Sequence, residues 1–422
     1  MPSKSSLYFL VLACLIIQIG SLSFLRHILG IYASPVVFVL SAILVTIFLL
    51  RITKQKINDV KNHGEPLIMH WVVILPVFVI LLLTGWLLLK SIIPNHPIDP
   101  SKSDILPQVK ILANRFVSGT EVYRPIKEFG YVLYPTYLPM TWLPFVIADW
   151  IQLDYRLWAY LLFSACVFTS VLLFKKKFIG TVLVVLLPFA VFFLVLKDQP
   201  QTAGWTIESM IAGFYLVFLF GLYKKHAMLV TVAFICCLLS RYAVVILLPF
   251  LLIIFFKTAG RRKTILIFGF TFLGLLLLFG LPFLTQQPDL ILKGYQYHTK
   301  AALAEWHGQS WQPPGSLPYQ LSQGYGLAIF FYKKHNIQNS LQLLQIIHLA
   351  VCFLVPFFFT TWYFMKRNHW LPSNVFLILL LNLYIVFFFA FIQLPYAYLF
   401  LTPLILSPVT AVLICFFPVK RN

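Results

Sequence analysis

Residues 136–151 read TYLPMTWLPFVIADWI, and whether this segment crosses a membrane decides the topology of the whole chain. The segment is apolar, yet it carries Pro139, Pro144 and Asp149 within 16 residues. Proline removes a helical hydrogen bond, and a membrane-spanning helix needs about 20 mostly apolar residues. We therefore predict that this segment is re-entrant or lies in the membrane interface.

The distribution of basic residues supports the same choice. Clusters of Lys and Arg follow apolar runs at 175–177, 224–225, 257–263, 366–367 and 420–421. If residues 136–151 crossed the membrane, all these clusters would face outward, whereas a non-crossing segment turns all of them toward the cytoplasm. The positive-inside rule favours the second arrangement. Both termini are then cytoplasmic, and the two long polar loops, 93–136 and 285–341, lie outside.

The composition is that of a polytopic membrane protein. Of the 422 residues, 60% are hydrophobic and 10% are charged, whereas soluble domains have about 25% charged residues. The net charge of +20 comes from short clusters between apolar runs, so anionic lipid headgroups are its expected partner, and nucleic acid is not. The six cysteines all fall inside apolar runs and indicate neither a disulfide framework nor a metal site.

The hydropathy pattern predicts an all-α fold with about 12 spans. The apolar segments are 7–27, 33–51, 69–92, 156–174, 178–196, 204–223, 227–240, 242–256, 264–284, 342–365, 371–391 and 395–417. An Arg in the middle of one long helix over 227–256 would be costly, so Arg241 favours two short helices there.

The chain divides into three parts along its length. Residues 1–68 form an N-terminal hairpin with a cytoplasmic loop, residues 69–341 form a central membrane region with both outer loops, and residues 342–422 form C-terminal spans. We expect a multi-pass protein of the plasma membrane, with the bacterial inner membrane as the first choice.

The first outer loop contains SDILPQVKILANRFVSGTEVY at residues 103–123. Ile105, Val109, Leu112 and Phe116 fall near one helical face, which predicts a helix along the membrane surface that begins at Asp104. An Asp in this place is also typical of a helix N-cap. The two interpretations are compatible, because a capped carboxylate is also rigidly held.

The same loop continues through an aromatic, proline-containing stretch from Tyr123 to Thr136. Arg124 and Lys127 in this stretch could clamp a phosphate, since cationic side chains form charge-assisted hydrogen bonds with phosphate oxygens. The alternative is an interfacial aromatic belt with snorkelling cations.

The second outer loop contains YQYHTKAALAEWHGQSWQPPGSLPYQ at residues 295–320. The spacing of His298, Glu305 and His307 matches no metal motif, so we predict no metal site. The aromatic residues Trp306, Trp311 and Tyr319 indicate either a wall that stacks on sugar or isoprenoid or interfacial anchoring.

The order of these motifs resembles the family 87 glycosyltransferases, which are GT-C-class membrane enzymes that use polyprenyl-phosphate-mannose. The resemblance is carried by Asp104 before a surface helix, by Gly119-x-x-x-Tyr123, and by Tyr134-Pro135 opening an apolar segment. Ser240-Arg241 before a short Pro249-containing helix and Gly308-Gln309-Ser310 in the last outer loop are also similar to family motifs. Thr136 and Tyr242 stand where the family usually has proline, and the Asp loop follows the third helix here instead of the first.

The resemblance implies a GT-C-like fold and an inverting transfer of mannose, or a related hexose, from a polyprenyl-phosphate donor to a lipid-linked or cell-envelope acceptor. It implies that Asp104 is the general base, with Asp99 in reserve. The glycines are scattered and form no phosphate-cradling loop, so the sequence itself predicts no cofactor. The expected ligands of the leaving lipid phosphate are Arg241 first, then Arg124, Lys127, His298 and His307. Tyr123, Tyr134, Trp306 and Trp311 are expected to stack on sugar or lipid.

Arg241 has a further argument of its own, because an Arg within apolar sequence is a functional-site hypothesis by default. Its structural alternative is a snorkelling or helix-capping Arg. Two other functions stay open for the whole chain. One is a polysaccharide polymerase or ligase, and the other is a non-enzymatic lipid or glycolipid transporter, for which internal repeats are typical.

Overall fold

The computed structural model describes residues 3–56, 68–174, 177–308, 312–313, 315–365 and 370–418. Within these ranges the chain is helical and forms no strand, and its only β-type pairing is an isolated antiparallel bridge between Ile126 and Leu133. The predicted all-α class is therefore confirmed.

The described part of the chain contains nine helices that are long and apolar enough to cross a membrane. They confirm a polytopic helical membrane protein. These helices are α1 (Lys4–Ser21), α2 (Arg26–Lys56), α3 (Ile68–Ile92), α7 (Tyr155–Leu173), α8 (Phe178–Asp198), α13 (Arg261–Leu275) continued by the π-helical η3 (Leu276–Leu284), α16 (Ile337–Met365), α17 (Ser373–Ala390), and α18 (Leu401–Phe416) preceded by η5 (Ala397–Phe400).

Three shorter helices coincide with the other three predicted segments. They are α10 (Glu208–Lys224), α11 (Ala227–Leu238) and α12 (Leu248–Thr258). The chain breaks between α11 and α12, where Arg241 precedes the 3-10 turn η2 (Tyr242–Val244). Two short helices therefore form over residues 227–258, as the position of the arginine predicts.

The segment at 136–151 forms only two short helices, α5 (Pro139–Trp142) and α6 (Phe145–Trp150). Both pack against α4 (Ile105–Val117). Trp150 at the end of α6 is 86% exposed, which suits a side chain in the membrane interface. No helix long enough to cross a membrane forms at 136–151. The spanning helices on either side, α3 and α7, are therefore connected at one end of the bundle.

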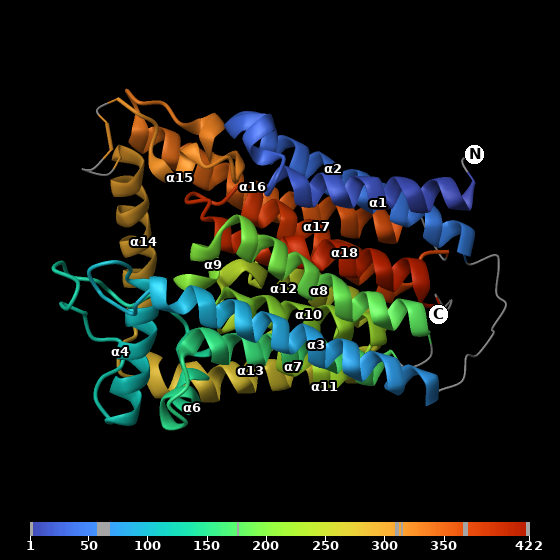
Figure 1. Ribbon diagram of the computed structural model, residues 1–422, viewed down its shortest axis with the longest axis horizontal. Coiled ribbons are helices and arrows are strands. Elements are labelled where there is room, and N and C mark those ends of the chain that lie inside the picture. The colour runs from blue at the N-terminus through green and yellow to red at the C-terminus, as the bar shows by residue number, and fades with distance from the viewer. Residues whose placement is uncertain are drawn as a thin grey trace.

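Figure 1 shows which elements gather at that end. The start of α1 and the end of α18 lie at one end of the bundle, and α4, α6 and α14 (Leu290–His307) lie at the other. Both α4 and α14 run across the bundle end, roughly perpendicular to the long helices. The short elements η1 (Ile93–Asn95), α9 (Pro200–Gly204), α15 (Tyr319–Ser322) and η4 (Leu327–Phe331) complete the described helices.

The burial of the long helices separates the core from the lipid-facing layer. In α18, 94% of the apolar window is buried, and in α17 the share is 78%, but in α3, α13 with η3, and α16 it is 22%. The last two spans of the chain therefore form the centre of the bundle, whereas α3, η3 and α16, which border the two outer loops, lie at its lipid-facing periphery.

Candidate functional site

Asp104 occupies the N-cap position of α4, but its side chain makes no capping hydrogen bond to the helix. The predicted helix forms as α4, and Val109 and Leu112 of its expected apolar face are fully buried, but Phe116 of that face is 43% exposed and Arg115, expected elsewhere, is buried. Tyr131 Oη donates a hydrogen bond of 3.4 Å to Asp104 Oδ2. The packed helix thus fixes the position of Asp104 while leaving most of the hydrogen-bonding capacity of its carboxylate unused.

The carboxylate of Asp104 lines a polar cavity of about 590 Å³ at the α4 end of the bundle. Such a volume falls in the range of ligand pockets, about 300–1,000 Å³. The lining comes from segments that are distant in the sequence: Lys102 and Asp104 before α4, Gln199 and Trp205 around α9, Glu305 near the end of α14, Gln320 and Gln323 around α15, and Tyr396 and Tyr398 before α18.

The two candidate carboxylates of the first outer loop lie in opposite environments. Burial raises the pKa of Asp104 above its ordinary value, although hydrogen bonding, including that from Tyr131, acts in the other direction. Asp99 instead accepts hydrogen bonds from the backbone N–H of Ser101 at 2.9 Å and from its hydroxyl at 2.8 Å. These bonds lower the pKa of Asp99, so Asp99 is engaged in a turn and is the weaker base.

Arg241 lies beside the cavity and is paired with a buried acid. Its Nη2 atom is 2.5 Å from Oε2 of Glu208, the first residue of α10. The Glu208 side chain is 1% exposed and that of Arg241 is 25% exposed. The arginine charge is therefore largely matched by a carboxylate from its own protein. Arg241 Nε and Glu208 Oε1 have no hydrogen-bond partner within the described residues.

Two tyrosines connect this ion pair with the cavity. The Arg241 guanidinium lies 5.9 Å from the centroid of the Tyr398 ring, and Tyr398 lines the Asp104 cavity. Burial raises the pKa of the Tyr137 phenol, and the charges of Asp104 and Glu208 raise it while that of Arg241 lowers it. Tyr137 therefore stands within electrostatic range of both the carboxylate and the ion pair.

The other predicted phosphate ligands do not line this cavity. Arg124 and Lys127 are exposed on the loop, and the Arg124 carbonyl accepts a hydrogen bond from Arg115. His307 is exposed at the end of α14. His298 is also exposed, but the surrounding protein and the charge of Arg241 lower its pKa. Of this set, Arg241 contacts Tyr398, which lines the cavity, and His298 lies within electrostatic range of Arg241.

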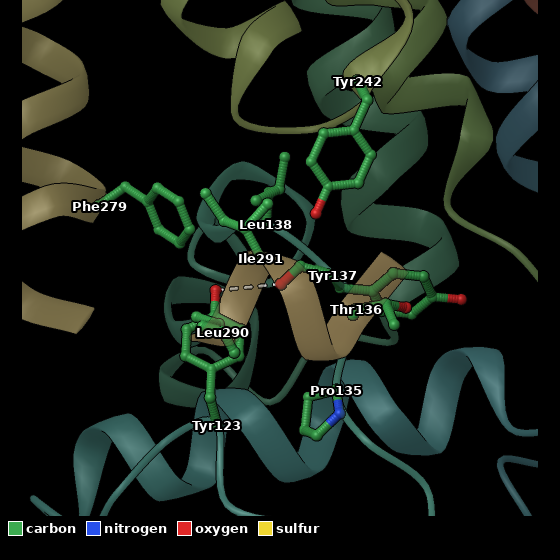
Figure 2. A pocket seen from close by; sticks show the side chains of 10 residues that line it. Tyr123, Pro135, Thr136, Tyr137, Leu138, Tyr242, Phe279, Leu290 and Ile291 are labelled. Atoms are coloured by element: carbon green, nitrogen blue, oxygen red, sulfur yellow. Dashed lines mark hydrogen bonds between the residues drawn. The ribbon is translucent and has the colours of Figure 1, made fainter. Parts of the chain in front are cut away.

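The predicted stacking residues have different environments. Trp306 is 0% exposed and donates from Nε1 to the Gln393 carbonyl at 3.0 Å, so its ring packs against protein. Tyr123 is buried, and Figure 2 shows its hydroxyl donating to the Tyr137 carbonyl, at 3.0 Å. Tyr134 is 39% exposed and lines a second cavity. Trp311 lies outside the described residues.

Several residues in and beside the cavity have no motif in the sequence that predicts them. Glu208 could have been identified from the sequence, because it is the only acidic residue inside the 12 predicted spans. An ionisable residue in a span implies a charged or polar partner. Glu305 and the tyrosines before α18 gave no such signal, because only the tertiary fold places them beside Asp104. Among the described residues, no group of three or more His, Cys, Asp or Glu side chains could hold a metal ion.

The helical bundle and the polar cavity at its end define a multi-pass membrane protein with a candidate ligand site at one end of the spans. No protein-family model matches the chain, and neither a curated protein nor a solved structure matches it significantly. The resemblance to family 87 glycosyltransferases therefore stays a prediction, and the function is argued from the site.

The Arg241–Glu208 pair generates a stability prediction. Arg241→Met leaves a buried carboxylate without its cation, and such a loss costs about 3–5 kcal/mol. Glu208→Gln should cost less, because Arg241 retains access to water, and the double variant should recover part of the stability that Arg241→Met loses. Thermal unfolding of the three variants in one detergent measures the order. Equal stability of all three and the unchanged protein would contradict a coupled pair.

Proposed function

We propose that the chain is an inverting membrane glycosyltransferase that moves a hexose, with mannose as the first choice, from a polyprenyl-phosphate donor to a lipid-linked or cell-envelope acceptor. The single observation that carries the proposal is the place of Asp104. It is a partly buried, incompletely hydrogen-bonded carboxylate in a ligand-sized polar cavity at the end of a membrane bundle. A lipid-linked donor reaches such a cavity from the bilayer, and a carboxylate there can accept a proton.

The reaction follows from this placement. Asp104 accepts the proton of the acceptor hydroxyl while that oxygen attacks the anomeric carbon of the sugar. The bond from the anomeric carbon to the acceptor oxygen forms as the bond to the phosphate oxygen breaks, and the lipid phosphate leaves on the opposite face. A general base works best when its pKa approaches the working pH, and burial raises the pKa of Asp104 in that direction.

Positive charge near the leaving phosphate stabilises the transition state. Lys102 and His96 line the cavity itself, whereas Arg241 lies behind Tyr398 and is paired with Glu208. We propose that Lys102 contacts the phosphate directly. Arg241, whose charge is mostly matched, holds Tyr398 in place and contributes a weaker, longer-range attraction.

The rest of the lining suits a sugar. Four glutamine side chains, Gln199, Gln201, Gln320 and Gln323, line the cavity, and an amide can both donate to and accept from hydroxyl groups. Trp205 and Tyr319 add aromatic surface on which the apolar face of a hexose can stack. This combination supports a neutral, hydroxyl-rich ligand more than a simple phospholipid.

Asp104→Asn is the direct test of the reaction. The variant keeps the side-chain volume but cannot accept the proton, so we expect transfer from polyprenyl-phosphate-mannose to fall about 10²–10⁴-fold, with donor binding retained. Asp99→Asn is the matched control and should keep most of the activity, since Asp99 only closes a turn. Full transfer by Asp104→Asn would overturn the assignment of the base. A protein that moves lipid without transferring sugar would be a transporter.

The rate should also depend on pH through Asp104. Because the base must be deprotonated, the rate should fall as the pH drops through a pKa above the ordinary Asp value of 3.8. The Tyr131 hydrogen bond favours the charged carboxylate and lowers that pKa. Tyr131→Phe should therefore move the acid limb of the pH–rate profile upward. An unchanged or downward-shifted limb would show that another group controls it.

The proposed orientation places the Asp104 cavity on the non-cytoplasmic side of the plasma membrane. A cysteine at Lys127, an exposed residue of the loop that follows α4, should then react with a membrane-impermeant maleimide in intact cells. A cysteine at Lys257, in the last turn of α12, should react only after permeabilisation. The opposite labelling pattern would reverse the orientation and place the cavity in the cytoplasm.

A further inference from the structure

A second cavity, of about 340 Å³, lies between the loop after α4 and the start of α14. Its lining is polar and aromatic and includes Glu121, Tyr134, Gln287, Asp289, Lys293 and Gly294. It shares no lining residue with the Asp104 cavity. The proposed transfer reaction uses none of its polar groups.

This cavity opens toward the lipid-facing surface of the bundle. It is continuous with the shallow apolar crevice in Figure 2, because Tyr123, Pro135, Leu290 and Gly294 line both. The crevice has Phe279 of η3 on one side and is also lined by Ile291 and Tyr242, which are 50% and 43% exposed, so it reaches the surface beside η3. Leu277 and Leu281, on the other face of η3, are more than half exposed. A π-helical stretch such as η3 is rare and is frequent at functional sites. A ligand in the cavity can thus carry apolar chains that lie along η3 in the membrane.

The charges of the cavity disfavour a phosphate headgroup. Lys293 Nζ lies 2.6 Å from Asp289 Oδ2, so the lysine charge is matched. Glu121 accepts a hydrogen bond from the Gln287 amide and gives the three charged lining residues a net charge of −1. Carboxylates and amides together can accept from and donate to hydroxyl groups, and Tyr134 offers a ring that is 39% exposed.

We propose that this second cavity binds the uncharged, hydroxyl-rich headgroup of a membrane glycolipid, with the acyl or isoprenoid chains of the lipid packed along η3. The proposal goes beyond the transfer reaction, since it rests on the second cavity alone and does not require Asp104 to be a base. The two cavities are joined by α14. Gly294 lines the second and Glu305 the first, and they are 11 residues apart, or about 16 Å at the rise of an α-helix.

Gly294 offers a specific way to close the cavity. It lies at the junction of the polar and apolar parts, and a Cβ atom placed on it would have only Thr136 Cγ2 nearby, at 3.9 Å. Gly294→Ala therefore fits without displacing a neighbour, and alanine favours the helix. A Gly294→Trp side chain must extend into the cavity and occupy the space of the headgroup.

The experiment uses the full chain in phosphatidylcholine nanodiscs that contain a diazirine-bearing monoglucosyl diacylglycerol. We expect photo-crosslinks that map to the loop at 121–138 and to residues 279–294, and unlabelled glycolipid should compete with them. Gly294→Trp should lower the crosslinking about tenfold, which corresponds to about 1.4 kcal/mol of binding free energy. Gly294→Ala and Asp104→Asn should both crosslink like the unchanged protein.

Two results would overturn the proposal. One is undiminished crosslinking by a folded Gly294→Trp variant. The other is equal, competing crosslinking at the same residues by a phosphatidylglycerol probe with the same chains. If Gly294→Trp fails to fold, Gln287→Ala keeps the cavity open while removing an amide, and it should reduce the preference for the glycolipid probe over phosphatidylglycerol. An unchanged preference would then exclude the headgroup site.

Loss of transfer in Asp104→Asn with intact crosslinking separates this proposal from the proposed function.

Discussion

The absence of water in the hydrocarbon core is the constraint on which the rest of the structure depends. Each backbone group there must be bonded within the chain, so the spans are helices, and each ionisable side chain needs a protein partner. Glu208, whose side chain is 1% exposed, meets this requirement through Arg241 at 2.5 Å. Because the interior tolerates few polar groups, the polar side chains that line the Asp104 cavity lie at the end of the bundle around α4, α9 and α14 (Figure 1).

Asp99 and Asp104 show how position alone can give two carboxylates different environments. They are five residues apart in the same loop, yet hydrogen bonds from Ser101 lower the pKa of one and burial raises that of the other. Pairs of titratable groups whose environments separate their pKa values often identify acid–base assignments. Here the comparison favours Asp104, and it does so on the contacts of the two side chains, independently of any family resemblance.

The sequence predicted the helices well, because hydropathy is a local property that a short window of residues reveals. Each of the 12 apolar segments coincides with an apolar helix, although α2 runs from Arg26 to Lys56, beyond the predicted 33–51, with a break in helical geometry at Gly30 (φ 73°) and a polar last turn that contains Lys54 and Lys56. The place of Asp104 before a surface helix was also local and was predicted. The opposite wall of its cavity was not, because Glu305 and Tyr398 are about 200 and 300 residues away in the chain. Trp306 was misleading for a related reason: a buried tryptophan and a ligand-stacking tryptophan have the same local sequence pattern.

The loop from Tyr134 to Leu138 lies between the two cavities and has contacts toward both. The Tyr137 carbonyl accepts from Tyr123, which lines the second cavity, while the Tyr137 phenol lies within electrostatic range of Asp104 and Arg241. Trp142 Nε1 donates to the Tyr123 hydroxyl, which ties this loop to α5. If a bound headgroup displaced this loop, the position of the Tyr137 phenol relative to Asp104 and Arg241 would change. No direct contact between two ligands would be needed. The connection through Trp142, Tyr123 and Tyr137 is short and consists of packed, hydrogen-bonded aromatic side chains. Connected networks of this kind are a physical means by which neighbouring sites influence each other.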